Sequence, residues 1–183
     1  ATESAIKTMV APGLLAVLRR HDVRATFFVI GSHAEQNAGL LEAIRRDGHE
    51  IANHLYRDRP SIRLSDAEFV EKLRRTEAII QPTGPIKWFR PGSGWIDDRM
   101  VELLYENGYR ACLSSVYPLD LAAPPTVTVW HTVNNARPGA ILVLHDGGPA
   151  RAQNVAILDE LLERLAEKGY AVLTVSELVA ASR

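Results

Sequence analysis

The sequence predicts an α/β fold in which helices cover a parallel sheet. Helix-like and strand-like segments alternate along the chain, and the strand-like segments are short apolar runs of the kind that parallel sheets bury. Several of these runs turn polar at their last residues, where parallel sheets and barrels expose reactive side chains. The length of 183 residues fits one compact domain, and we expect residues 1–183 to form it.

The elements can be predicted in chain order. The apolar residues Leu14, Leu15, Val17 and Leu18 indicate a helix that ends before a strand at Ala25–Ile30. Further helices are predicted at Ala38–Arg46, Ser65–Gln81, Asp97–Asn107 and Gln153–Lys168, with a short final helix from Ser176. Further strands are predicted at His49–Asn53, Lys87–Arg90, Arg110–Val116, Ala140–His145 and Ala171–Val175.

Two of the helix starts carry recognisable acidic and capping residues. Ser65 is followed by Asp66 and Glu68, which places a hydroxyl cap and two carboxylates at the positive end of a helix dipole. Asp97 and Asp98 form an adjacent acidic pair at the next predicted start, and we assign them the same structural role.

The composition of the chain limits the kinds of binding partner and of reactive group that we expect. The formal net charge is -1, without the basic excess that phosphate-backbone binding usually requires, so we expect no nucleic-acid partner. The lone Cys112 lies in an apolar run and is interpreted as a small buried hydrophobe instead of a nucleophile. No apolar stretch approaches the roughly 18 residues of a membrane span, and the chain has no signal-peptide pattern.

Four segments stand in a distinctive order. They are ATFFVIG at Ala25–Gly31, GHEIANH at Gly48–His54, FRPGSG at Phe89–Gly94 and ILVLHDG at Ile141–Gly147. In this order they resemble the polysaccharide deacetylases, metal-dependent enzymes that remove N- or O-acetyl groups from amino sugars. The resemblance covers nearly the whole chain and implies an irregular (β/α) barrel, which periodicity alone cannot distinguish from an open parallel sheet.

One segment of that family has no counterpart before Ala1. It is the opening strand, which ends in a Thr-Phe-Asp-Asp-Gly type motif with the catalytic base and one metal ligand. We therefore expect a barrel without its first strand, either open or closed by another segment. An exposed sheet edge would then be a place for association with a second chain or a swapped segment.

His54 and Asp58 are the candidate metal ligands. His54 ends a strand-like run, and Asp58 follows four residues later across a polar turn closed by Pro60. Imidazole and carboxylate both bind first-row divalent metals, although a strand cap and a solvated turn residue are the plainer interpretation. The resemblance implies a His-x-x-x-His pair in which Asp58 replaces the second histidine, and it implies zinc, with cobalt, manganese or nickel as alternatives. The carboxylate would shift the preference towards harder metals.

Arg90 begins an Arg-Pro-Gly-Ser-Gly turn whose backbone can approach a ligand closely, or which is an ordinary strand-to-helix turn. The resemblance implies that this arginine orients the catalytic carboxylate and that the turn forms one wall of the substrate groove. The candidate substrate-binding residues are Trp88, Pro91, Gly92, Ser93 and Tyr117. The two aromatic residues among them would stack on sugar rings, with a place in the core as the alternative.

His145 is the candidate general acid, because it stands where a buried strand would meet solvent. The resemblance implies that this histidine protonates the leaving amine and that a nearby carboxylate tunes it. Asp120 falls in the corresponding region, with a loop turn residue as the alternative. A paired carboxylate stabilises the protonated imidazole. The remaining histidines have no ligand-like spacing to the motifs; they include His21, His33, His49 and His131.

These residues together predict a metal-dependent hydrolase that deacetylates an N-acetylated glycan such as chitin, peptidoglycan or an exopolysaccharide. Two alternatives stay open. One is a catalytically silent domain of the same fold that binds a glycan. The other is a hydrolase of small non-peptide amides, since the framework determines the water-activating chemistry more firmly than the acyl substrate. The resemblance also favours an extracellular or cell-envelope location.

Overall fold

The computed structural model describes residues 2–117, 119–147 and 152–182, and their side chains from residue 11 onward. The chain divides into two compact units. The first consists of Ala1–Arg24, Ser114–Leu173 and Ala181–Arg183, and the second of Ala25–Leu113 and Thr174–Ala180. Each unit is therefore assembled from segments that lie far apart in the sequence. The assignment of residues 1–183 to a single domain stays a prediction.

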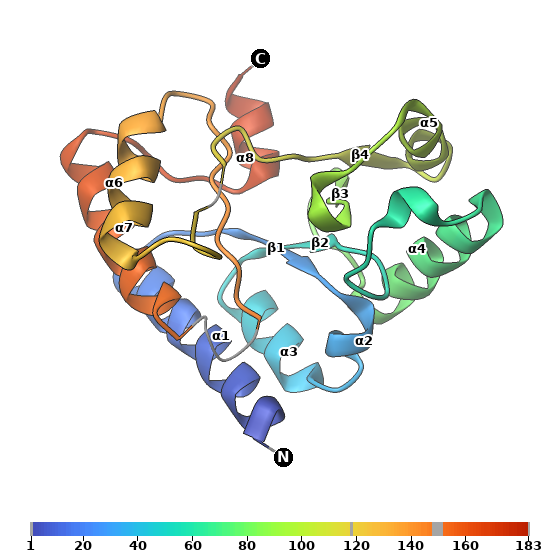
Figure 1. The fold of residues 1–183 in the computed structure, drawn as a ribbon, viewed down its shortest axis with the longest axis horizontal. Coiled ribbons are helices and arrows are strands. Elements are labelled where there is room, and N and C mark those ends of the chain that lie inside the picture. The colour runs from blue at the N-terminus through green and yellow to red at the C-terminus, as the bar shows by residue number, and fades with distance from the viewer. Residues whose placement is uncertain (1, 118, 148–151, 183) are drawn as a thin grey trace. The chain divides into compact units, whose positions relative to one another are not determined.

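The second unit is built on a parallel sheet of four strands in the order β1-β2-β3-β4 (Figure 1). The strands are β1 (Thr26–Val29), β2 (Glu50–Asn53), β3 (Lys87–Phe89) and β4 (Tyr109–Ala111). Val29, Asn53, Phe89 and Ala111 are in register at the carboxyl ends of these strands. Residues that directly follow the strands therefore emerge at one edge of the sheet, as parallel sheets require.

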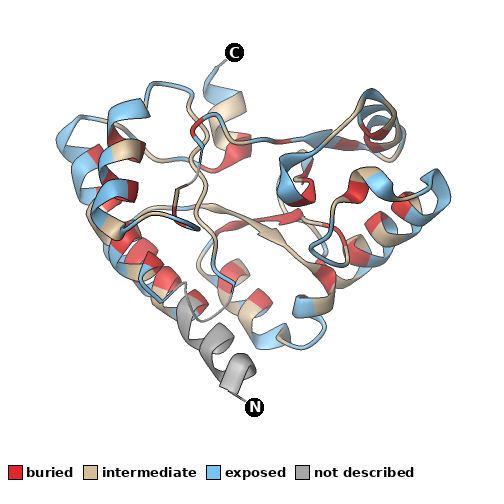
Figure 2. Cartoon of the chain, viewed as in Figure 1, coloured by how far each residue is buried: buried red, intermediate tan, exposed pale blue. Residues whose placement is uncertain are grey.

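Helices cover this sheet, which confirms the predicted α/β class. They are α2 (Gly31–Ala34), α3 (Ala38–Arg46), α4 (Asp66–Ile80), α5 (Asp98–Glu106) and α8 (Val175–Ala181), with 3-10 turns η1 (Ser61–Arg63) and η2 (Gly92–Gly94). The buried residues of α4 recur every three or four positions and form one stripe (Figure 2). The core of the unit contains Leu55, Phe69, Leu73, Phe89, Met100, Leu104 and Tyr109.

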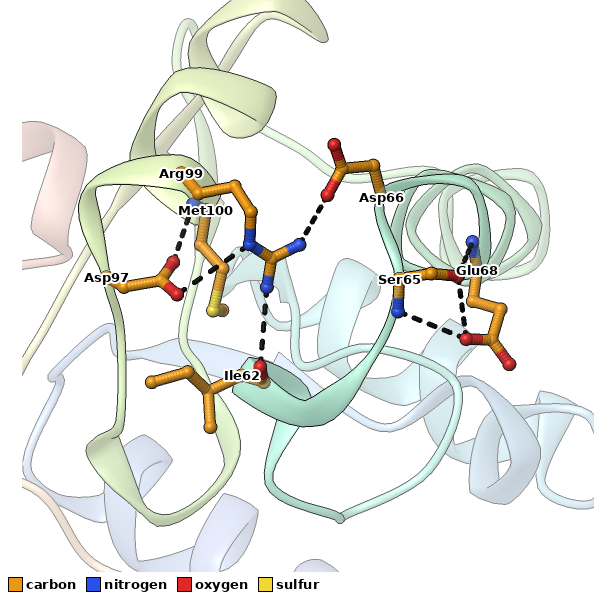
Figure 3. A network of polar contacts seen from close by, with 7 residues as sticks. All are labelled: Ile62, Ser65, Asp66, Glu68, Asp97, Arg99 and Met100. Atoms are coloured by element: carbon orange, nitrogen blue, oxygen red, sulfur yellow. Dashed lines mark hydrogen bonds and ion pairs between the residues drawn. The ribbon is translucent and has the colours of Figure 1, made fainter.

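The start of α4 is capped by Ser65 as predicted, and the acidic pair predicted at the start of α5 includes the cap residue Asp97 (Figure 3). Ser65 Oγ accepts from the backbone N–H of Glu68, whose carboxylate accepts from the backbone N–H of Ser65 at 3.1 Å. Asp97 caps α5 by accepting from the backbone N–H three residues later at 2.8 Å. Arg99 on α5 donates to Asp66 at the start of α4 at 2.6 Å, so one ion pair joins the two helix starts.

The first unit contains α1 (Thr2–Arg20), α6 (Pro125–Asn135) and α7 (Asn154–Glu167). Val129 and Val133 of α6 pack with Ile157 and Leu161 of α7. The apolar residues that predicted the first helix are all buried in α1: Leu14, Leu15, Val17 and Leu18. None of the helices among the described residues is both long and apolar enough to cross a membrane.

Two predicted strands are wrong. Ala140–His145 and Ala171–Val175 are not strands, and no described residue of the first unit lies in one. The first segment forms no strand-to-strand hydrogen bonds of a sheet. Its Leu144 instead packs against the buried cluster of α6 and α7. The second segment leads into α8, where Thr174 Oγ1 accepts from the backbone N–H of Glu177 at 3.2 Å. The strand predicted at Arg110–Val116 is also shorter, because β4 ends at Ala111.

Candidate functional site

The turn after β2 places His54 at the carboxyl edge of the sheet. The next residue, Leu55, is buried and has a left-handed backbone with a φ of 62°. Asn53 holds this turn, because its Oδ1 accepts from Leu55 N at 2.8 Å and its Nδ2 donates to Leu73 O at 3.0 Å. A left-handed leucine costs free energy and persists only where its surroundings enforce it, so the core determines where the His54 side chain starts.

The His54 ring is oriented by the turn that follows β3. Its Nδ1 lies 2.6 Å from the carbonyl oxygen of Arg90. Since a carbonyl can only accept, Nδ1 carries the proton and Nε2 of the neutral ring keeps its lone pair. Histidines that bind metals are typically oriented in this way by a hydrogen bond from the second ring nitrogen.

Nε2 of His54 lies 3.9 Å from Oδ1 of Asp58. This separation is too long for a hydrogen bond. It suits two ligands of one ion, because metal–ligand bonds of about 2.0–2.2 Å place neighbouring donors of a tetrahedral site roughly 3.5 Å apart. The two candidate ligands therefore fit a shared divalent metal, with Asp58 exposed and His54 partly buried.

Gly92 lets the Arg-Pro turn approach the loop that carries Asp58. A Cβ atom at Gly92 would lie 2.7 Å from the carbonyl oxygen of Arg59 and 3.1 Å from Oδ1 of Asp58. Pro91 and Gly92 are buried, whereas Ser93 is exposed and has a positive φ of 59°. The structure thus brings His54, Asp58, Arg90 and Gly92 together within the second unit.

The guanidinium of Arg90 contacts Cys112 and Phe28. Nε donates to the carbonyl oxygen of Cys112 at 3.1 Å, and the guanidinium carbon lies 3.9 Å from the centre of the Phe28 ring. Burial lowers the pKa of Arg90, and contact with Cys112 opposes that change. Among the described residues no carboxylate is hydrogen-bonded to this side chain, so the orienting role of Arg90 stays a prediction.

Cys112 is buried, as predicted. Burial raises the pKa of its thiol, and the nearby Arg90 acts in the opposite direction. Because a reactive cysteine needs a lowered thiol pKa and access to solvent, the side chain is a packing residue of the sheet edge.

The structure corrects the expectation for Trp88. Its side chain is only 6% exposed, and the indole N–H donates to Ser176 Oγ at 2.9 Å. A sugar cannot reach the face of a ring in this position, so Trp88 is a core residue of the second unit. Tyr117, in the first unit, is 76% exposed and keeps its candidate role, as does exposed Ser93.

In the first unit, His145 and Asp120 form an imidazole–carboxylate pair. Nδ1 of His145 lies 3.0 Å from Oδ1 of Asp120, and the backbone N–H of His145 donates to Oδ2 at 2.8 Å. The carboxylate is buried, whereas the imidazole is 39% exposed. Since a carboxylate accepts from Nδ1, Nε2 is the nitrogen that can exchange a proton with another molecule.

The environment of Asp120 keeps its carboxylate ionised. Burial alone would raise the pKa of Asp120, but hydrogen bonds from the side chain and backbone of His145 and from Asn154 outweigh it and lower the pKa. The ionised carboxylate accepts from Nδ1 and so fixes the orientation of the imidazole. The pair is therefore equipped to act as a general acid.

Asn154 is hydrogen-bonded to both residues of this pair, and the sequence did not predict it. It is the first residue of α7, and its amide nitrogen donates to Oδ2 of Asp120 at 2.8 Å. An asparagine at a predicted helix start suggests a cap, and nothing in its spacing points to a residue 34 positions earlier.

Another group of side chains with possible ligand atoms for a metal lies in the first unit. His21, Asp159 and Glu163 of the first unit offer ligand atoms within 4.8 Å of one another and could hold a metal ion. His21 and Asp159 are 138 residues apart in the sequence, so no spacing motif reveals them. Arg20 forms an ion pair with the Asp159 oxygen that His21 contacts at 2.6 Å. A fixed cation on that oxygen disfavours a second positive ion there.

Comparison with known proteins reveals clear similarity to one family. Residues 5–112 match the family model described as polysaccharide deacetylase. A peptidoglycan-N-acetylglucosamine deacetylase from Bacillus cereus is 35% identical over 177 residues, which cover 92% of this chain and 81% of that protein. A chitooligosaccharide deacetylase from Azorhizobium caulinodans is 31% identical over 179 residues, covering 89% of this chain and 85% of the relative.

Comparison with solved structures also finds similar proteins. The crystal structure of a CE4 family pseudoenzyme from Bacillus anthracis superimposes with a TM-score of 0.84 at 29% identity, covering 93% of this chain and 60% of that chain. A mutant of this pseudoenzyme is described as having restored enzymatic activity. This chain thus spans less than two thirds of that solved chain, and the similarity includes both deacetylases and a pseudoenzyme.

Proposed function

Since the chain belongs to the polysaccharide deacetylase family, we propose that it is a metal-dependent hydrolase that removes acetyl groups from an N-acetylated glycan. The observation that carries this proposal is the His145–Asp120 pair, in which Nδ1 lies 3.0 Å from a buried carboxylate. Such a pair can supply the general acid that amide hydrolysis needs, because an amine leaves readily only after it has been protonated.

The names of the relatives support the proposed substrate class. Their names specify peptidoglycan N-acetylglucosamine and chitooligosaccharide, which share an N-acetylated amino sugar. We therefore place the acetamido group of N-acetylglucosamine at the centre of the proposed reaction. Exposed Ser93 and Tyr117 are the residues proposed to contact the sugar chain.

His54 and Asp58 are proposed to hold the metal. Support comes from the donor atoms 3.9 Å apart and from the Arg90 carbonyl that orients the ring. Zinc suits this donor set, and the carboxylate also admits cobalt, manganese or nickel. When bound, the metal would supply Lewis acidity and lower the pKa of a coordinated water.

The proton chemistry is assigned to the chain's own residues. His145 gives a proton from Nε2 to the departing amine, while ionised Asp120 holds Nδ1 and keeps the ring in position. Arg90 is proposed to orient the carboxylate that accepts the proton of water. That carboxylate is not assigned to any of the described residues.

A silent glycan-binding domain is the second candidate function. It is favoured by the guanidinium of Arg90, which among the described residues contacts Cys112 and no carboxylate. Similarity to a pseudoenzyme of the same family also favours it. A silent domain would bind the glycan without turnover.

The decisive experiment measures metal content and deacetylation of an N-acetylglucosamine oligomer in the same sample. Wild type, His54→Ala and His33→Ala are compared, because His33 is an exposed histidine of α2 outside the proposed site. We expect one bound metal and turnover in wild type and in the His33 variant, and loss of both in the His54 variant. Glycan binding without metal or turnover would instead establish the silent domain.

A further inference from the structure

Asn154 is a fully buried residue that contacts both members of the His145–Asp120 pair. Its exposed fraction is 0%. Nδ2 donates to Oδ2 of Asp120 at 2.8 Å and to the backbone carbonyl oxygen of His145 at 2.6 Å. Both partners can only accept, so the amide nitrogen, and not the amide oxygen, must face them.

The Asp120 carboxylate is held by several hydrogen bonds. Oδ2 accepts from Asn154 Nδ2 and from the backbone N–H of His145, and the imidazole Nδ1 lies 3.0 Å from Oδ1 and 3.2 Å from Oδ2. The carboxylate is thereby fixed in rotation. The oxygens are thereby held in place beside the ring nitrogen, and the bond from Asn154 to the His145 carbonyl fixes the backbone that carries the ring.

The side-chain amide of Asn154 does not cap α7, the helix that this residue begins. The residue at the cap position of α7 is Gln153, and no side-chain hydrogen bond caps this helix start. Oδ1 of Asn154 is buried without a hydrogen-bond partner among the described residues. The hydrogen bonds that this side chain makes among the described residues therefore go to Asp120 and His145 and not to the start of α7.

We infer that Asn154 is a positioning residue for the general acid, which holds Asp120 and His145 in the geometry that directs Nε2 towards the leaving group. The inference rests on the proposed function. Asn154 acts through Asp120 and His145.

Asn154→Asp is the sharpest variant, because it preserves size while replacing the donating amide by an acceptor that faces Asp120. Asn135→Asp is the matched control: Asn135 is exposed on α6, and its Nδ2 donates to the His131 carbonyl at 2.8 Å. With an N-acetylglucosamine oligomer as substrate, we expect kcat to fall about tenfold or more in Asn154→Asp, with KM changed by less than about twofold. The control should match wild type.

A second substrate separates positioning from general damage. 4-Nitrophenyl acetate releases a phenolate that needs no proton from a general acid. Asn154→Asp should therefore keep its rate on this ester within about twofold of wild type while it loses the amide reaction. Equal losses on both substrates, or an unchanged kcat on the oligomer, would overturn the inference.

A spectroscopic measurement keeps the inference testable without turnover. Nitrogen-15 NMR of the His145 ring in wild type should show a proton on Nδ1 in the neutral form, and Asn154→Asp should shift the ring towards a mixture of tautomers. An unchanged tautomer in Asn154→Asp contradicts the inference even if wild type deacetylates nothing, which is the outcome that would refute the proposed function instead. If Asn154→Asp does not fold, Asn154→Ser, which retains one donor, is compared by the same spectrum.

Discussion

Gly92 is the residue on which the arrangement of the proposed metal ligands depends most directly. The Gly92→Ala substitution would place a methyl group 2.7 Å from a backbone oxygen of the Asp58 loop and 3.1 Å from the Asp58 carboxylate. Backbone cannot rotate away as a side chain can, so we expect the loop to shift and metal affinity to fall by about tenfold or more. Calorimetric titration with zinc measures the change.

The control for this substitution is Gly39→Ala. Gly39 lies on α3, and no atom lies within 4 Å of the position that its Cβ would take. Alanine is a better helix former than glycine, so this variant should bind zinc as wild type does and be slightly more stable. Equal zinc affinity of Gly92→Ala and wild type would show that the Asp58 loop does not hold the metal.

A second prediction for a single residue concerns Asp120, whose contribution to the free energy of unfolding should depend on pH. Burial opposes ionisation, but the hydrogen bonds from His145 and Asn154 lower the pKa of Asp120 in the folded protein. A lowered folded-state pKa means that the ionised carboxylate stabilises the fold above its unfolded pKa of about 3.9, and that this contribution disappears as pH falls through the folded pKa. Wild type should therefore exceed Asp120→Asn in unfolding free energy at pH 7, with a difference that shrinks below about pH 4.

Urea unfolding of both proteins between pH 7 and pH 3 provides the test. The two proteins converge in acid because protonated Asp120 is neutral, as asparagine is. A difference that stayed constant over this range would mean that the carboxylate contributes through its shape and not through its charge.

At the scale of elements, the helices were the most predictable part of the fold. The structure has α3 at the predicted Ala38–Arg46, and α4 begins after the predicted cap Ser65. Caps and the 3.6-residue period are local properties, so they can be recognised without the tertiary structure. The four strands of the second unit were also predicted, because short apolar runs between helices are typical of buried parallel strands.

The errors concern segments whose environment the sequence does not specify. An apolar run such as Ala140–His145 suits a strand or an irregular segment equally, and only packing against α6 and α7 decides. Helix α6 was not predicted, and its run Thr126–Val129 alternates threonine with valine, all of them β-branched, as a strand would. Pro125 at its first turn was the available signal for a helix start.

In the candidate site, too, some residues could be predicted from the sequence and others could not. The resemblance paired His145 with a carboxylate near Asp120, and the structure brings the two side chains within 3.0 Å. The catalytic roles of these residues stay predictions. Asn154 could not be found from spacing, since its partners precede it by nine and 34 residues. The sequence left Trp88 open between a groove wall and the core, because an aromatic residue beside a motif has the same sequence pattern in both, and the structure shows it buried.

At the scale of the whole chain, the last helix completes a unit that begins at Ala25. Thr26 Oγ1 accepts from the backbone N–H of Val175 at 2.8 Å, and the indole N–H of Trp88 donates to Ser176 Oγ at 2.9 Å. Glu50 is only 5% exposed, and its carboxylate accepts from the hydroxyls of Thr26 and Ser176. Residues separated by as many as 149 positions thus satisfy one another's buried polar groups.

Truncation of the chain after Leu173 should therefore destabilise the second unit out of proportion to the number of residues removed. The deletion leaves the Glu50 carboxylate and the Trp88 indole without their Ser176 partners. Each such group costs roughly 1–3 kcal/mol when it stays buried, so we expect the free energy of unfolding to fall by about 2–6 kcal/mol. A chain that ends at Ala180 retains these partners and should stay within about 0.5 kcal/mol of the full chain. Urea unfolding compares the three chains, and hydrogen exchange of the β2 amides locates the effect. If the two truncated chains were equally stable, the buried carboxylate would be satisfied by water, and the last helix would contribute little to the strand that carries His54.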